Sequence, residues 1–112
     1  MASKVHIMYN VGIIKIRGTL IGDAESTAVH KMVRDLIEEN IHKIVIDLSR
    51  VKLINSNGLG TLMACYSSVY HVNGKIGLAK ISEKTLKILS ITKVHTLFDH
   101  FNSIREAVKA YR

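Results

Sequence analysis

Runs with a period of two residues alternate with runs of helical period along the whole chain, and this alternation limits the fold more than any other feature. Residues 4–9 and 11–17 place apolar side chains at every second position, which is typical of β-strands. Asn10-Val11-Gly12 joins the two runs. The chain is therefore predicted to begin with a β-hairpin.

The next segment has helical periodicity, after residues 18–22 break the second strand. Asp23 can cap this helix or favour the positive end of its dipole, and Asn40 can end it. The apolar residues that form one face are Val29, Met32, Val33, Leu36 and Ile37.

The same alternation continues to the C-terminus. Residues 43–48 are rich in β-branched side chains and predict a buried central strand. A second amphipathic helix is expected to end near Asn73-Gly74. Residues 76–79 and 96–101 predict two more strands, and 82–91 a third helix. Ser103 and Glu106 form a capping box that opens a fourth helix. The apolar face of the second helix consists of Leu59, Leu62, Met63, Tyr66, Val69 and Tyr70.

This order of elements predicts an α/β fold. Strands separated by helices pair in parallel, whereas the leading hairpin adds an antiparallel pair. We expect a mixed sheet of four or five strands with about four helices, covered mainly on one face. A chain of 112 residues has room for one hydrophobic core, so residues 1–112 are expected to form a single domain.

The composition excludes several classes of protein. The sequence has no apolar run long enough for a membrane span and no signal peptide pattern. Cys65 is the only cysteine, so neither an internal disulfide nor a cysteine-based zinc site is expected. We expect Cys65 to be a small buried or half-buried residue rather than a nucleophile. The six histidines show no metal-ligand spacing. We expect a cytoplasmic protein without metal or cofactor.

The charge distribution is uneven. The net charge is +7, and no acidic residue occurs between Leu48 and Ser82. The basic residues of this central zone are Arg50, Lys52, Lys75 and Lys80. A basic zone favours an acidic protein, a nucleic acid or a membrane surface as partner, although a solvated basic surface explains it equally simply.

The turn before the second helix carries the most informative chemistry. Ser56 lies at or next to the predicted helix start, where a serine oxygen can accept from a free backbone N–H. The same place can hold a phosphate, because first-turn amides and the helix dipole favour negative charge. Gly58 and Gly60 leave the backbone open to close approach by another molecule.

The chain resembles the STAS domain family in its small, stand-alone bacterial form. Residues 47–60, Asp-Leu-Ser-Arg-Val-Lys-Leu-Ile-Asn-Ser-Asn-Gly-Leu-Gly, are similar to the family's Asp-Leu-Ser-x-Val-x-φ-Ile-Asp-Ser-Ser/Thr-Gly-Leu-Gly, where φ is apolar. Three further segments, 17–22, 74–79 and 86–94, also resemble family motifs. The resemblance covers nearly the whole chain.

This resemblance implies an anti-sigma factor antagonist. In the family, the serine before x-Gly-Leu-Gly is phosphorylated by a partner kinase that is also the anti-sigma factor, and a phosphatase reverses the step. Ser56 occupies that position. Partner contact is expected through Asp23 and the switch turn, which comprises Asn55, Asn57, Gly58, Leu59 and Gly60. Direct DNA binding is not expected, and a weak homodimer stays open.

Three positions depart from the family pattern. Asn55 replaces an acid, Asn57 replaces a second Ser or Thr, and Ile21 stands where the best-known members carry an acid. Two other functions therefore stay open. One is a non-phosphorylated STAS scaffold or subunit of a larger regulatory or lipid-transport complex, and the other is a binder of nucleic acid or membrane through the basic zone. An enzyme is not expected, because the sequence shows no nucleophile–base pair or carboxylate pair.

Overall fold

The structure is a computed structural model that describes residues 3–20 and 23–112, with the backbone alone at 19, 20 and 23–26. Five strands and four α-helices follow one another as the alternation predicts. In chain order the elements are β1 (Lys4–Met8), β2 (Val11–Leu20), α1 (Asp23–Glu38), β3 (Lys43–Ile54), α2 (Ser56–His71), β4 (Lys75–Ala79), α3 (Glu83–Ile91), a 3₁₀ helix η1 (Val94–Leu97), β5 (Asp99–Phe101) and α4 (Ile104–Tyr111).

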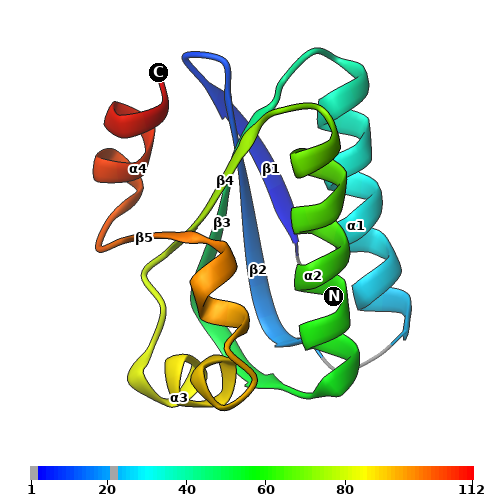
Figure 1. Cartoon of the computed structure of the whole chain (residues 1–112), viewed down its shortest axis with the longest axis vertical. Helices are drawn as coiled ribbons and strands as arrows, with labels where there is room; N and C mark the ends of the chain where they lie inside the picture. The colour runs from blue at the N-terminus through cyan, green and yellow to red at the C-terminus, as the bar shows by residue number, and fades with distance from the viewer. Residues whose placement is uncertain (1–2, 21–22) are drawn as a thin grey trace.

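The strands form one mixed sheet in the order β1-β2-β3-β4-β5. β1 pairs with β2 in antiparallel fashion, and all other neighbours are parallel. The expected α/β fold, with its N-terminal hairpin and about four helices, is therefore confirmed. Figure 1 shows α1 and α2 on one side of the sheet and α4 on the other.

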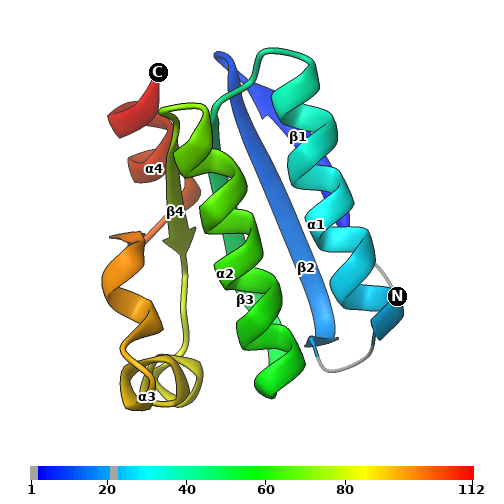
Figure 2. The same cartoon turned by 45° about the vertical axis from the view of Figure 1, so that its right-hand side comes forward.

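The sheet has a well-covered front face and a partly covered back face (Figure 2). On the front face, α1, α2 and α3 bury the larger core, which includes Ile14, Ile46 and Leu62. On the back face, α4 buries a smaller cluster that includes Val45 and Val108. This asymmetry is the expected cover mainly on one face.

The hairpin turn lies one residue earlier than the sequence pattern indicates. Tyr9 and Asn10 are its central residues, with φ of 51° and 63°, and Met8 pairs directly with Val11. Two consecutive residues at positive φ are typical of the type I′ turn, which matches the twist of paired strands. Asn10 tolerates this conformation through its short polar side chain.

Strands β2 and β3 are longer than predicted. As a result, the switch turn directly follows the end of β3. The expected break at residues 18–22 is wrong for its first residues, because β2 passes Gly18 in a bulge and ends at Leu20. Gly18 has a φ of +83°, which glycine adopts without strain. β3 continues to Ile54 because Val51 and Ile54 are buried in the front core.

The fifth strand expected over residues 96–101 is present but covers only the second half of that range. Residues 94–97 form the 3₁₀ helix, and only Asp99–Phe101 pair with β4. The pattern misled because Val94, which begins the 3₁₀ helix, and Phe98, which follows it, are both buried in the front core. Among the described residues, no helix is long and apolar enough to cross a membrane.

Candidate functional site

The first turn of α2 is capped by Asn55, not by Ser56. Asn55 has an extended backbone, and its Oδ1 accepts from the backbone N–H of Asn57 at 3.0 Å and of Gly58 at 3.2 Å. The interpretation of Ser56 as the cap is therefore wrong. Asparagine and serine cap helices about equally well, so residue preference alone could not separate them.

Ser56 is the first residue of α2, and its side chain is exposed. None of the hydrogen bonds between described residues involves its hydroxyl. The cap holds the neighbouring amides in place, so the position of Ser56 is fixed by the helix start while its Oγ stays accessible. No acidic residue lies in the first turn of α2, so a negative group on Ser56 would meet no like charge there.

The other residues of the switch turn differ in exposure. Asn57 and Gly60 are exposed, Leu59 is half-buried against the front core, and Gly58 is buried. A Cβ atom built at Gly60 would meet nothing within 4 Å, so Gly60 offers open space to another molecule. Asp23 begins α1, but its side chain lies outside the described residues.

A polar groove of about 290 Å³ runs between α1 and α2 beside this turn. Asn57 and Gly60 line it from α2, whereas His30 and Arg34 line it from α1. His30 Nε2 is 3.0 Å from the hydroxyl of Ser68 and so links the two helices. Burial, followed by the nearby charge of Arg34, lowers the pKa of His30.

Sequence reasoning missed His30 and Arg34 as site residues. Thr27, His30 and Arg34 are spaced three and four residues apart and therefore share one face of α1. That spacing was a readable signal. What the sequence does not contain is which face of α1 packs beside the start of α2.

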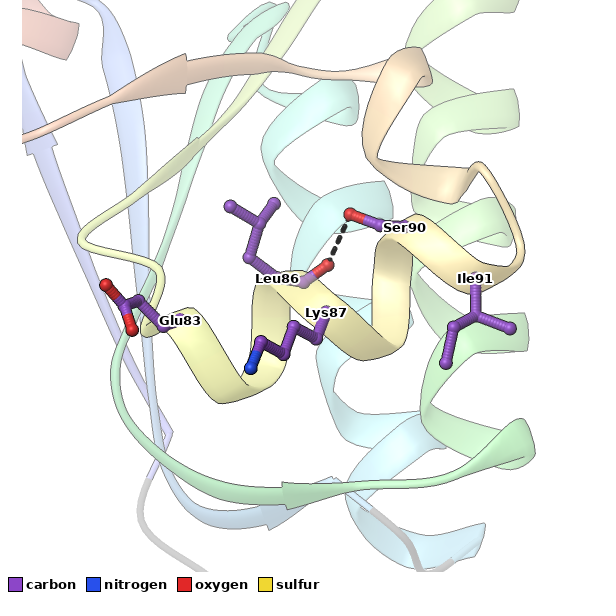
Figure 3. A pocket seen from close by; sticks show the side chains of 5 residues that line it. All are labelled: Glu83, Leu86, Lys87, Ser90 and Ile91. Atoms are coloured by element: carbon purple, nitrogen blue, oxygen red, sulfur yellow. Dashed lines mark hydrogen bonds between the residues drawn. The ribbon is translucent and has the colours of Figure 1, made fainter.

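An apolar depression of about 460 Å³ lies on the outer side of α3. Figure 3 shows the side chains that line it, together with the hydrogen bond from the hydroxyl of Ser90 to the carbonyl of Leu86, 2.7 Å long. Ile91 is 83% exposed, and Leu86 is half-buried. Two more large apolar side chains, Leu53 before the switch turn and Met63 within α2, are also exposed. Of these features, only the depression on α3 gathers apolar side chains in one place, whereas Leu53 and Met63 do not line it.

Comparison with known proteins identifies the family. The model of the STAS domain matches residues 3–107. The chain belongs to the STAS domain family.

Individual relatives of this STAS chain agree with that assignment. A protein of Thermotoga neapolitana, whose name describes it as a candidate anti-sigma factor antagonist and a homologue of TM1081, is 29% identical over 75 residues. That alignment covers 67% of this chain and 66% of the relative, so the chain matches just under two thirds of the relative's length.

Two solved structures have the same fold. The crystal structure of a candidate anti-sigma factor antagonist from Thermotoga maritima is 24% identical, with a TM-score of 0.83, and covers 98% of this chain and 94% of that one. The phosphorylated form of SpoIIAA, a Bacillus cell fate determinant, is 16% identical, with a TM-score of 0.78, and covers 99% and 100%. The STAS chain therefore has the fold of anti-sigma factor antagonists.

The basic central zone of this STAS domain is not a single patch. Lys75 begins β4, whereas Arg50 and Lys52 lie near the end of β3 and Lys80 follows the end of β4. Because β3 and β4 are parallel, Lys75 lies at the opposite end of the sheet from the other three. The basic residues of the central zone, although near one another in the sequence, therefore do not form one basic surface.

Cys65 is fully buried in the front core, as expected. Burial raises the pKa of its thiol to about 12, so it stays protonated and unreactive near neutral pH.

The two tyrosines of α2 differ in burial. Tyr66 packs against the front core, whereas Tyr70 is exposed, and the centroids of their stacked rings are 5.8 Å apart. Within residues 3–20 and 23–112, no three His, Cys, Asp or Glu side chains gather as a metal site would require.

Proposed function

We propose that this STAS domain is a regulatory binding module of the anti-sigma factor antagonist type. In this proposal the unphosphorylated domain binds an anti-sigma factor that is also a serine kinase. Phosphorylation of Ser56 ends the complex, and a phosphatase restores the binding form. A kinase that uses ATP as donor would place this exchange in the cytoplasm. The observation that carries the proposal is the exposed Ser56 hydroxyl at the start of α2.

The chemistry of phosphorylation suits this position. The kinase transfers the γ-phosphoryl group of ATP to Ser56 Oγ, the hydroxyl proton passes to the kinase's base, and ADP leaves. The phosphate carries about two negative charges at neutral pH. It would lie at the positive end of the α2 dipole, so it costs the domain little stability.

The effect on a partner follows from charge rather than from a change of shape. The amides of Asn57 and Gly58 are already bound to Asn55 Oδ1, so the new phosphate would project outward instead of rearranging the turn. An apolar or acidic partner surface that covers Ser56 would then face buried, unpaired charge. A complex that depends on this contact should dissociate.

The proposed docking surface surrounds Ser56. It comprises Asn55, Asn57, Gly58, Leu59 and Gly60, together with Asp23 at the start of α1. The neighbouring groove adds Arg34 and His30, which favour an acidic or hydrogen-bonding group from the partner. Leu53 and Met63 add exposed apolar area on either side of the switch turn.

The decisive experiment is intact-mass spectrometry of the protein purified from its native cells, with identification of the proteins that co-purify. Wild type should show a fraction heavier by one phosphate, about 80 Da. Ser56→Ala should lack that fraction and retain the kinase partner. Ser67→Ala is the matched control, because Ser67 is an exposed serine on the same helix. It should behave like the wild type.

Two outcomes would contradict the proposal. A phosphate that persists in Ser56→Ala would assign the modification to another residue. A protein without modification, held by one stable partner in both wild type and Ser56→Ala, would favour the alternative of a constitutive STAS scaffold or a subunit of a larger regulatory or lipid-transport complex.

A further inference from the structure

The outer edge of β1 is an accessible sheet edge. β1 lies at the end of the strand order and pairs with β2 through five consecutive residue pairs without a bulge. All five residues, Lys4–Met8, are exposed. Among the described residues, β1 forms its ladder with β2 alone. Proteins usually blunt such edges with proline, bulges or several charges, whereas β1 carries one lysine.

The side chains of β1 form two rows of different chemistry. Cross-strand partners share a face of the sheet, and Ile14 belongs to the front core while Val11 and Ile13 belong to the back cluster. Val5 and Ile7 therefore lie on the front face, where they are 37% and 51% exposed. Lys4, His6 and Met8 lie on the back face.

The back row continues into a groove beside α4. The groove has a volume of about 220 Å³ and an apolar lining from Met8, Ile104 and Val108. Arg105, Lys109 and Arg112 complete its wall. Met8 belongs to both features, so the back row of β1 and the groove form one surface, hereafter the β1–α4 surface.

Basic side chains outnumber acidic ones on and around the β1–α4 surface. The nearby exposed acids are fewer, and each accepts a hydrogen bond: Asp99 Oδ2 from the hydroxyl of Tyr111 at 2.6 Å, and Glu106 Oε2 from the N–H of Asn102 at 3.1 Å. Asp47 is fully buried, 4.0 Å from the ammonium group of Lys15. The four basic residues Lys4, Arg105, Lys109 and Arg112 have no ion-pair partner among the described residues.

We propose that β1 accepts an extended acidic segment of a partner protein as a sixth strand of the sheet. Backbone hydrogen bonds to the free edge would supply affinity, and alternate side chains would supply selectivity. On the back face, carboxylates would lie beside Lys4 and His6, within the positive field of the groove. On the front face, apolar side chains would cover Val5 and Ile7.

The charge and shape of this surface favour such a partner over two others. A second copy of this chain would bring another net charge of +7 to the same edge, which opposes pairing. A membrane surface has no extended backbone that could pair with the free edge of β1, although Ile7 and Met8 are 51% and 48% exposed. The surface does not include Ser56, so its occupation is independent of the phosphorylation proposed above.

The test uses a fluorescein-labelled peptide of alternating Glu and Val, added to the unphosphorylated full chain. Fluorescence anisotropy measures binding, and amide hydrogen exchange followed by NMR locates it. We expect exchange in residues 4–8 to slow by at least about tenfold in the complex, because strand pairing protects the edge amides. Affinity should fall by about tenfold or more between low and high salt.

Charge-reversal variants make the test specific. Lys4→Glu combined with Arg105→Glu should weaken peptide binding by at least about tenfold. The matched control is Lys84→Glu combined with Lys87→Glu, which changes the net charge equally but lies on α3, on the front face. The control should change the affinity by less than about threefold, a contribution of long-range charge alone.

Several outcomes would overturn the proposal. One is the absence of peptide binding at low salt, and another is binding without protection of residues 4–8. Equal affinity for a peptide of alternating Lys and Val would exclude recognition of acidic segments. Binding to phosphatidylglycerol vesicles without binding to the peptide would assign the surface to a membrane instead.

Discussion

The two faces of the sheet differ in how completely they are covered. On the front face, three helices bury a continuous core that includes Val33, Leu48 and Leu62. On the back face, the single short helix α4 covers the β3–β5 side, and β1 remains exposed. Figure 2 shows α1 and α2 in front of the sheet, α3 below β4, and α4 at the left.

Because of this difference, the front face contributes most of the stability, whereas the back face presents most of the open surface. Burial of apolar area is the main stabilising term, so the front layer supplies most of it. The back face, where cover is partial, keeps an open edge and unpaired basic side chains. The front layer also has an exposed end, the switch turn, where we propose that Ser56 is phosphorylated.

The largest expected effect is the loss of stability on truncating a front-face core residue. Leu62→Ala should lower the free energy of unfolding by about 3 kcal/mol, because Leu62 is fully buried and the cavity cannot collapse between α2 and the sheet. Val108→Ala on the back face should cost about 1 kcal/mol, since fewer atoms are removed and the short helix α4 can settle. Urea unfolding followed by circular dichroism measures both.

These two variants test the asymmetry directly. Equal losses of unfolding free energy in Leu62→Ala and Val108→Ala would show that α4 is packed as tightly as α2. The two faces would then not differ in their contribution to stability. Leu59→Ala is a useful control on α2, because Leu59 is only half-buried. Its cost should lie between those of the other two variants.

Most of the fold could be predicted from the sequence, because the spacing of apolar residues in most segments corresponds to one buried face of a strand or helix. Residues 44–48 of the predicted strand are buried, as are Leu62 and Val69 of the predicted helix face. Met63 and Tyr70, which the pattern placed on the same apolar face, are exposed. The predictions failed where tertiary contacts outweigh local signals. Gly18 predicted a break, yet pairing with β3 carries β2 through a bulge. No local signal distinguishes those two outcomes.

The candidate site was predictable in position but not in detail. The strand–turn–helix pattern located Ser56 at the start of α2, whereas the cap turned out to be Asn55. The polar groove beside it depends on the packing of α1 against α2, which brings His30 within hydrogen-bond distance of Ser68, 38 residues along the chain. Such a contact depends on the tertiary fold and has no signal within either helix alone.

A smaller effect should separate the structural and the exposed residues of the switch turn. Asn55→Ala should lower the free energy of unfolding by about 1 kcal/mol, because two first-turn amides lose their acceptor. Ser56→Ala should change it by less than about 0.5 kcal/mol, since the hydroxyl is exposed. Urea unfolding of the unphosphorylated proteins measures the difference. An equal loss in both variants would contradict Asn55 as the cap.

A loss of stability is also expected in alkaline solution, and each face contributes one group to it. Burial raises the pKa of the Cys65 thiol on the front face to about 12. On the back face, burial and then the hydrogen bond to Asp99 raise the pKa of the Tyr111 phenol. Both groups therefore keep their protons in the folded chain after the unfolded chain has lost them. Stability should be full below about pH 9 and should fall as the pH rises above it.

Two variants separate the contributions of the faces to this alkaline loss. Cys65→Ala and Tyr111→Phe should each make the fall in unfolding free energy between about pH 9 and pH 11 less steep, because each removes one group that holds its proton only in the folded state. Urea unfolding at a series of pH values gives the slopes. If the double variant loses stability as steeply as the wild type, neither group is responsible. A flatter slope from Cys65→Ala alone would mean that α4 opens on the back face before its phenol contributes, which is the behaviour expected of the less completely covered face.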